Sequence, residues 1–146
     1  MPVISVTLSP GDSRQAEERP DASAIVRDFL ARVQARELDA AQAFLAPGFS
    51  MHFPGSGPMH RLEEMVQWSR QRYRNVGKVF KTFDEAWSGE GAVVYCTGTL
   101  YGVWLDGSAF DGVRFVDRFE IRDGLIQRQD VWNDLALVMP AQGAAA

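Results

Sequence analysis

The sequence is poor in the residues that build covalent, metal-bound or phosphate-binding sites. It has one cysteine, Cys96, which excludes an internal disulfide, and only two histidines. No cluster of His, Cys and Asp has the spacing of metal ligands. Glycine-rich loops of the kind that hold phosphates or dinucleotides are also missing. We therefore expect a site that uses neither a metal nor a cofactor.

Long apolar runs and basic stretches are missing too. No hydrophobic segment is long enough to span a bilayer, and the N-terminus lacks the basic flank and apolar core of a secretion signal. The net charge is −4 and no basic cluster stands out, which argues against nucleic acid or an anionic membrane as a partner. We expect a cytoplasmic protein whose partner is a small hydrophobic molecule.

The 146 residues fit a single domain. Residues 1–21 are rich in Pro, Gly, Ser and charge and are expected to form a flexible arm, residues 22–139 the folded domain, and residues 140–146 a frayed tail. Periodic apolar residues predict helices over about 23–36, 37–45 and 61–75, a short strand over 49–53, and long strands from Lys78 onward. This order predicts an α+β fold in which a curved antiparallel sheet packs over the N-terminal helices and leaves an apolar pocket.

The chain is organised around residues 113–134, which are expected to form a β-hairpin. Asp123-Gly124 is typical of a two-residue turn with positive φ at both positions. Pairing outward from this turn would place Asp117 opposite Asp130, on a face otherwise built from Phe, Ile and Trp. A three-residue loop would instead put Asp117 opposite Gln129, and we disfavour it because apolar residues would then lie beside polar ones.

Two facing carboxyl groups in an apolar pocket could act as an acid and a base. Burial and a neighbouring carboxylate both raise the pKa of a carboxyl group, so Asp117 and Asp130 would share one proton over part of the physiological pH range. One neutral and one ionised carboxyl group is what proton transfer beside a carbonyl requires. Arg128, one pair along the hairpin, could instead neutralise either acid in a salt bridge.

The other candidate site residues are expected on the pocket face or at its mouth: Phe29, His52, Phe53, Tyr73, Phe115, Phe119, Arg128 and Trp132. The aromatic residues could stack against the rings of a ligand or could be ordinary residues of the hydrophobic core. His52 could serve in the pocket mouth or simply be solvated. Pairing outward from a second tight turn, Asp106-Gly107, brings Cys96 near Asp117, which would raise the pKa of the thiol and make it inert.

Three short motifs resemble those of a known family: Arg36-Glu37-Leu38-Asp39, Phe53-Pro54-Gly55, and residues 118–126, RFEIRDGLI. With the layout of the chain, they resemble the SnoaL-like branch of the nuclear transport factor 2-like superfamily over about residues 22–134. That superfamily includes ketosteroid isomerases, polyketide cyclases and limonene epoxide hydrolases. The resemblance implies a homodimer, with the outer face of the sheet, Val116 and Val131 included, as its interface.

The resemblance also implies roles for the two acids. Asp117 matches the position where ketosteroid isomerases place a protonated acid that hydrogen-bonds the substrate oxygen. Asp130 matches the acid on the last strand of the SnoaL-type cyclases and of limonene epoxide hydrolase. Phe53 stands where the isomerase has its general base, with His52 beside it as a candidate replacement, and Phe29 stands where the isomerase has a tyrosine.

The strand before the hairpin departs from the hydrolase pattern. Tyr95-Cys96-Thr97 lacks the Arg-x-Asp pair of limonene epoxide hydrolase. With the substitutions at the isomerase positions, this departure argues against both a true ketosteroid isomerase and a limonene-type hydrolase.

Two functional hypotheses follow. The first is a cofactor-free acid/base enzyme that cyclises, isomerises or dehydrates a polyketide- or terpenoid-like molecule, with Asp117 holding the substrate oxygen and Asp130 moving a proton. The alternative is a non-catalytic ligand-binding or assembly module, in which side chains fill the pocket and Arg128 neutralises both acids. An open cavity with an unpaired acid favours the enzyme.

Overall fold

The computed structural model describes residues 21–140. The expected flexible arm (residues 1–21) and frayed tail (residues 140–146) lie outside the described residues except for Asp21 and Pro140. The elements in chain order are α2 (Ala22–Gln34), α3 (Leu38–Gln42), β1 (Leu45–His52), α4 (Leu62–Arg70), β2 (Tyr73–Ser88), β3 (Gly91–Trp104), β4 (Ala109–Arg122), β5 (Leu125–Asn133) and the 3₁₀ turn η1 (Leu135–Leu137).

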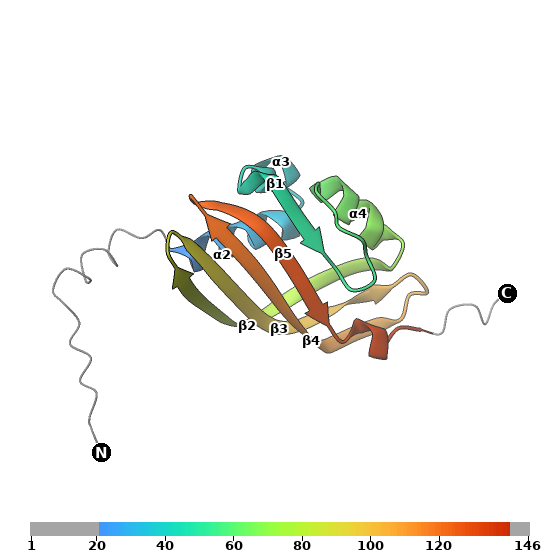
Figure 1. Cartoon of the computed structure of the whole chain (residues 1–146). Helices are drawn as coiled ribbons and strands as arrows, with labels where there is room; N and C mark the ends of the chain where they lie inside the picture. The colour runs from blue at the N-terminus through green and yellow to red at the C-terminus, as the bar shows by residue number, and fades with distance from the viewer. Residues whose placement is uncertain (1–20, 141–146) are drawn as a thin grey trace, which may run out of the picture.

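One curved five-stranded sheet organises the fold, in the order β1-β5-β4-β3-β2. Strand β1 runs parallel to β5, and the other neighbours are antiparallel. Figure 1 shows α2, α3 and α4 gathered on one side of this sheet. The predicted α+β architecture, with the sheet curved over N-terminal helices, is therefore confirmed.

Helix α2 forms where the sequence predicts it. Asp21 caps its start, because the side-chain Oδ1 accepts a hydrogen bond from the Ala24 amide at 3.1 Å. The apolar stripe of the helix turns toward the sheet, and Val26 and Phe29 are buried. The Phe29 ring meets the Phe119 ring of β4 edge-on, with centroids 6.2 Å apart. This contact holds the helix against the centre of the sheet.

The predicted third helix is too long. Helix α4 ends at Arg70, and β2 begins at Tyr73, which pairs with Trp104 of β3. Gly77, two residues beyond the predicted end of this helix, lies inside β2, where an added Cβ would be 2.4 Å from Cζ of Tyr101. Pairing with β3 therefore overrides the helical pattern of residues 71–75, and the glycine is needed because a tyrosine ring covers it.

The hairpin turn between β4 and β5 forms as predicted, but the register beyond it does not. Asp123 and Gly124 both have positive φ, 54° and 73°, and Ile121 pairs with Ile126. The next pair is Glu120 with Arg128, so Gln127 is an extra residue that forms a β-bulge.

The bulge separates the two acids that were predicted to face each other. Asp117 pairs with Val131, and Phe115 pairs with Asn133 rather than with Trp132. An uninterrupted register would have pressed two charged residues of β5, Arg128 and Asp130, into the apolar interior. Because unpaired buried charge is costly, the bulge that turns them outward is the favourable solution.

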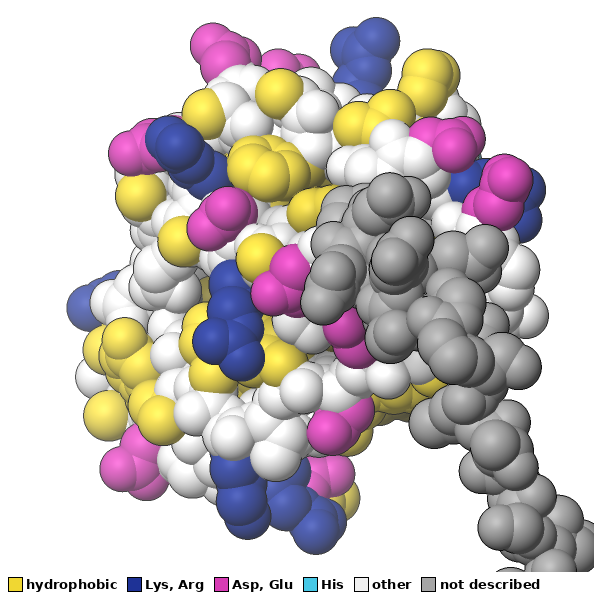
Figure 2. Space-filling view, turned by 90° about the vertical axis from the view of Figure 1, so that its left-hand side faces the viewer, with side chains coloured by type: hydrophobic (Ala, Val, Ile, Leu, Met, Phe, Trp, Pro, Cys, Tyr) yellow, Lys and Arg dark blue, Asp and Glu magenta, His cyan; other side chains and the backbone are white. Residues whose placement is uncertain are grey.

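One face of the described part of the chain has a mixed surface. On the side that faces left in Figure 1, acidic and basic side chains lie among small hydrophobic patches, without a broad area of one sign (Figure 2). No helix within residues 21–140 is long and apolar enough to cross a membrane.

Candidate functional site

A cavity of about 120 Å³ lies between the helices and the sheet. Its walls are mostly apolar and come from α2, α4 and all five strands, with Phe29, Met51 and Phe115 among the large side chains. The side chains that bring polar atoms to its lining are Gln34, Arg36, Ser69, Tyr73, Lys78, Asp117, Gln129 and Asn133. An apolar hollow with a few polar groups is the usual form of a small-molecule site.

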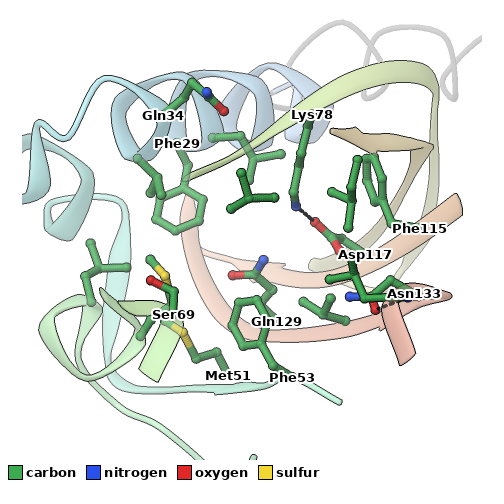
Figure 3. Close-up of a pocket in the computed structure, with 18 of the residues that line it drawn as sticks. Phe29, Gln34, Met51, Phe53, Ser69, Lys78, Phe115, Asp117, Gln129 and Asn133 are labelled. Carbon is green, nitrogen blue, oxygen red and sulfur yellow. Dashed lines mark hydrogen bonds and ion pairs between the residues drawn. The ribbon is translucent and has the colours of Figure 1, made fainter. Parts of the chain in front are cut away.

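Asp117 of β4 is the fully buried acid of this cavity. Its Oδ2 accepts a hydrogen bond from Nζ of Lys78 on β2. Its Oδ1 is also buried and has no hydrogen-bond partner. Figure 3 shows the lysine reaching from β2 toward the carboxyl group. The site thus holds one satisfied and one unsatisfied carboxyl oxygen.

Burial sets the protonation of this acid. Loss of water around the carboxyl group raises the pKa of Asp117, and the positive charge and hydrogen bond of Lys78 partly offset that rise. The same ammonium lies 4.7 Å from the centroid of the Phe115 ring, within range of a cation–π contact. Asp117 is therefore easier to protonate than an ordinary aspartate, as an acid/base group near neutral pH requires.

Cys96 lies beside Lys78 and Asp117, and its thiol is unreactive. It pairs with Asp117 across β3 and β4, as predicted, and is fully buried. Burial foremost, and then the charge of Asp117, raise the pKa of the Cys96 thiol to about 12. A thiol that stays protonated is a poor nucleophile.

Two further polar side chains can orient a ligand in the cavity. Gln129 of β5 is 4% exposed, and its side chain lines the cavity. Figure 3 shows this amide directed into the middle of the pocket. Tyr73 is also buried, and loss of water raises the pKa of its phenol, so the hydroxyl keeps its proton. Both groups can donate to a ligand oxygen.

Five predicted site residues line the cavity, namely Phe29, Phe53, Tyr73, Phe115 and Asp117. Phe119 is fully buried behind Phe29, in the core rather than in the cavity wall. Phe53 also packs against Trp68, with ring centroids 5.2 Å apart. Of the predicted residues, four aromatic side chains and one of the two predicted acids, Asp117, therefore line the cavity.

The other four predicted residues, His52, Arg128, Asp130 and Trp132, are not part of the cavity lining. Asp130 accepts a hydrogen bond from Nε of Arg128 at 2.8 Å, and its Oδ1 lies 3.5 Å from Nδ1 of His52. Trp132 is 55% exposed. The predicted facing pair is wrong, because the bulge at Gln127 turns Arg128, Asp130 and Trp132 to the other face of the sheet.

The same shift brings inward two residues that were expected on the outer face. Gln129 and Val131 line the cavity, so Val131 is not available to the expected dimer interface. The inward position of both residues follows from the one-residue bulge, because the side chain of every residue beyond it points to the opposite face of the sheet.

Lys78 is the functional candidate that the sequence prediction missed. A signal for it was present, because Val76, Lys78 and Phe80 alternate and all three line the cavity. A lysine between two apolar residues of one strand face places its aliphatic stem on that face, so its ammonium must either reach solvent or find a polar partner there.

No group of three His, Cys, Asp or Glu side chains able to hold a metal ion occurs within residues 21–140. The polar groups of the cavity are one amine, one carboxyl group, amides and hydroxyls. Such a set can transfer protons, hold a carbonyl oxygen and stabilise an enolate.

Comparison with known proteins places the chain by family and fold. The model of the SnoaL-like domain matches residues 26–129. No curated protein matches the chain.

Three solved structures illustrate the likeness. One is a protein of unknown function, described as nuclear transport factor 2-like, from Burkholderia pseudomallei (22% identity, TM-score 0.64, covering 79% of this chain and 92% of that one). Another is provisionally named a polyketide cyclase, from Xanthomonas campestris pv. campestris (17%, 0.64, 81% and 93%). The third is TerC, co-crystallised with polyporic acid (17%, 0.64, 79% and 92%).

At these identities the solved structures establish the fold but not the activity. The match of the family model spans well over half of the chain, from within α2 to Gln129 in β5. The curved sheet, the helices on one side of it and the cavity between them agree with that match. The chain belongs to the SnoaL-like domain family.

Proposed function

We propose that this protein is an acid/base enzyme that transfers protons on a small hydrophobic carbonyl compound of polyketide or terpenoid kind. The observation that carries the proposal is the unpartnered Oδ1 of Asp117, buried in a mostly apolar cavity. An unsatisfied buried oxygen costs stability, and a substrate atom would satisfy it. Cyclisation, isomerisation and dehydration all require such a proton carrier.

In this proposal Asp117 touches the substrate and moves the proton. Burial raises its pKa above that of an ordinary aspartate, which favours the protonated form, and its contact with Lys78 fixes the carboxyl group in place. The ammonium of Lys78 can also stabilise negative charge that develops on a carbonyl oxygen. Gln129 and Tyr73 orient the substrate, and the aromatic wall packs against its rings.

Two of the structural neighbours have descriptions that refer to small organic compounds. One carries a provisional polyketide cyclase name, and TerC was crystallised with polyporic acid. These descriptions apply to those proteins. Extending a related ligand class to this chain is part of our proposal.

One observation favours the alternative of a non-catalytic binding module. The carboxyl group of Asp117 already has a charged partner in Lys78, as a structural ion pair would. The cavity is also small, at about 120 Å³. In that case a ligand would bind without being converted.

Exchange of protons next to a carbonyl separates the two functions. Cyclohexanone and acetophenone in heavy water serve as probes, and NMR follows deuterium entering the positions beside the carbonyl. We expect the protein to accelerate exchange and Asp117→Asn to reduce that acceleration by about 10²-fold or more, with the circular dichroism spectrum unchanged. Equal exchange by Asp117→Asn and the unsubstituted protein would overturn the proposal.

A further inference from the structure

Lysine is scarce in this chain, and one of its lysines lies in the cavity. Of the 15 Lys and Arg residues, only Lys78 and Lys81 are lysines. Lys81 is exposed on β2, whereas Lys78 lines the cavity. Arginine keeps its charge under all ordinary conditions, but lysine can lose a proton and become a nucleophile.

The surroundings of Lys78 suit a reaction at its nitrogen. Its Nζ donates to Oδ2 of Asp117 and lies over the Phe115 ring. An ammonium has three N–H groups, and Asp117 is its one hydrogen-bond partner among the described residues. The acid that could take its proton is thus already in contact with it.

Lys78 can also be reached from outside. Its side chain is 21% exposed, and it lines a second, more open groove of about 440 Å³ between α2 and β2, with Arg27 and Phe80 among the groove residues. A lysine that served only to neutralise Asp117 would not need to line both the cavity and the groove. A carbonyl compound that enters either the cavity or the groove can contact the amine of Lys78.

We propose that Lys78 forms an imine with a small hydrophobic aldehyde or ketone bound in the cavity, and that Asp117 carries the protons. The inference rests on the proposed function in one respect, that the ligand contains a carbonyl group. It goes further by assigning a covalent intermediate to a named amine.

The protons and bonds balance around the pair. The Lys78 ammonium passes one proton to Oδ2 of Asp117, and the freed nitrogen forms a C–N bond as the carbonyl π electrons move onto oxygen. A proton shifts from that nitrogen to the oxygen, which gives a carbinolamine. Asp117 then protonates the hydroxyl group, the C–O bond breaks, water leaves and an iminium forms. Asp117 ends ionised, as it began.

The iminium explains why the amine and the acid lie together. It withdraws electrons from the neighbouring carbon, so a proton there is removed more readily than from the parent ketone. Asp117, whose pKa is raised by burial, is positioned to accept that proton.

Reductive trapping tests the inference directly. The intact protein is incubated with benzaldehyde or acetophenone and sodium cyanoborohydride, and peptide mass mapping locates the stable adduct. We expect labelling of Lys78 at least about tenfold faster than that of Lys81 or the N-terminal amine, because a nearby acid and a binding pocket favour it. Labelling of Lys78 no faster than that of Lys81 would overturn the inference.

Matched variants make the assignment specific. Lys78→Arg should abolish the cavity adduct, and Lys81→Arg should leave it unchanged. Because the peptide map reports both lysines within the unsubstituted protein, the test stands even if Lys78→Arg folds poorly.

The two proposals fail in different ways. If Asp117→Asn keeps full proton exchange while Lys78 is still labelled selectively, the proton-carrying role of Asp117 is wrong in both proposals and only the imine at Lys78 stands. If Asp117→Asn loses exchange while Lys78 labels no faster than Lys81, the acid/base function stands and the imine is wrong.

Discussion

Lys78 of β2 reaches across β3 to hydrogen-bond Asp117 of β4, so two charged side chains from non-adjacent strands meet in a mostly apolar cavity. The strand between them contributes Cys96, Gly98 and Leu100 beneath the contact. Attraction between buried charges has to offset the loss of water around both. This balance makes the pair sensitive to substitution and to pH.

Lys78→Met should lower the free energy of unfolding by about 3 kcal/mol near neutral pH, because it leaves the buried Asp117 without its charged partner. The double variant Lys78→Met/Asp117→Leu should recover most of that loss, since no buried charge remains. Urea denaturation of the three proteins measures both effects. A double variant less stable than the single one would contradict this account of the pair.

The deficit of Lys78→Met should also grow as pH rises. Burial raises the pKa of folded Asp117 above its unfolded value, so its contribution to stability is full below the unfolded pKa and falls as pH rises through the folded one. Without Lys78 the folded pKa rises further, and the loss is larger. Unfolding measured at about pH 5 and about pH 8 should show the smaller deficit at the lower pH.

Asp130→Asn should leave proton exchange on the ketone probes within about threefold of the unsubstituted protein, whereas Asp117→Asn should cost about 10²-fold or more. Asp130 faces away from the cavity and is hydrogen-bonded to Arg128. Each substitution replaces an aspartate by an asparagine of nearly equal size, Asp117 on β4 and Asp130 on β5. Each variant is therefore the control for the other. Equal losses would mean that Asp130 acts on the ligand after all.

Cys96 should resist alkylation in the folded protein. With the pKa of its thiol raised to about 12 by burial and by Asp117, the thiolate is scarce below that pH. Iodoacetamide at about pH 8 should leave the native chain unmodified and modify it fully in urea, as intact mass shows. Rapid modification under native conditions would mean that this part of the sheet opens easily.

Gly98→Ala should destabilise the fold by about 3 kcal/mol or more. An added Cβ would lie 2.0 Å from the backbone oxygen of Val79 and 3.1 Å from Cε1 of Phe115, and a strand backbone cannot move aside cheaply. Gly48→Ala is the matched control, because nothing lies within 4 Å of its added Cβ. Thermal denaturation should separate the two variants clearly, and equal melting temperatures would contradict the prediction.

We propose that the outer face of the sheet pairs with a second copy of the chain. Trp132, Val116 and Tyr95 are exposed on this face, and exposed apolar surface of this kind favours association. Light scattering after gel filtration should give a dimer mass, and Trp132→Glu should give the monomer. Leu137→Glu, which changes an exposed apolar residue in η1, should remain dimeric. A monomeric unsubstituted protein would rule out this pairing.

The tight turn at Asp123-Gly124 was predictable because its two positive φ angles demand particular residues. The bulge after it was not, because Gln127 has no local feature that distinguishes it from a regular strand residue. Only the cost of burying Arg128 and Asp130 favours it, and that cost depends on the completed sheet. Lys78 was missed for a related reason: its partner lies 39 positions away.

The end of α4 shows the same limit. Tyr73 continues the helical spacing of the apolar residues of α4, yet it pairs with Trp104 of β3. Whether a short segment continues a helix or joins a sheet depends on the strand that is available to pair with it. By contrast, α2 depends on the spacing of apolar residues close in sequence, and this helix was predicted.

The single surplus residue in β5 has a consequence for transferring roles between relatives. Ungapped superposition of this strand on a relative with a regular one would equate Asp130 with a ligand-facing position, although Gln129 and Val131 occupy that side here. Residue roles in this family are therefore transferred most safely when the alignment gap is placed by strand pairing rather than by sequence similarity. A catalytic residue assigned without that step can lie on the wrong surface of the molecule.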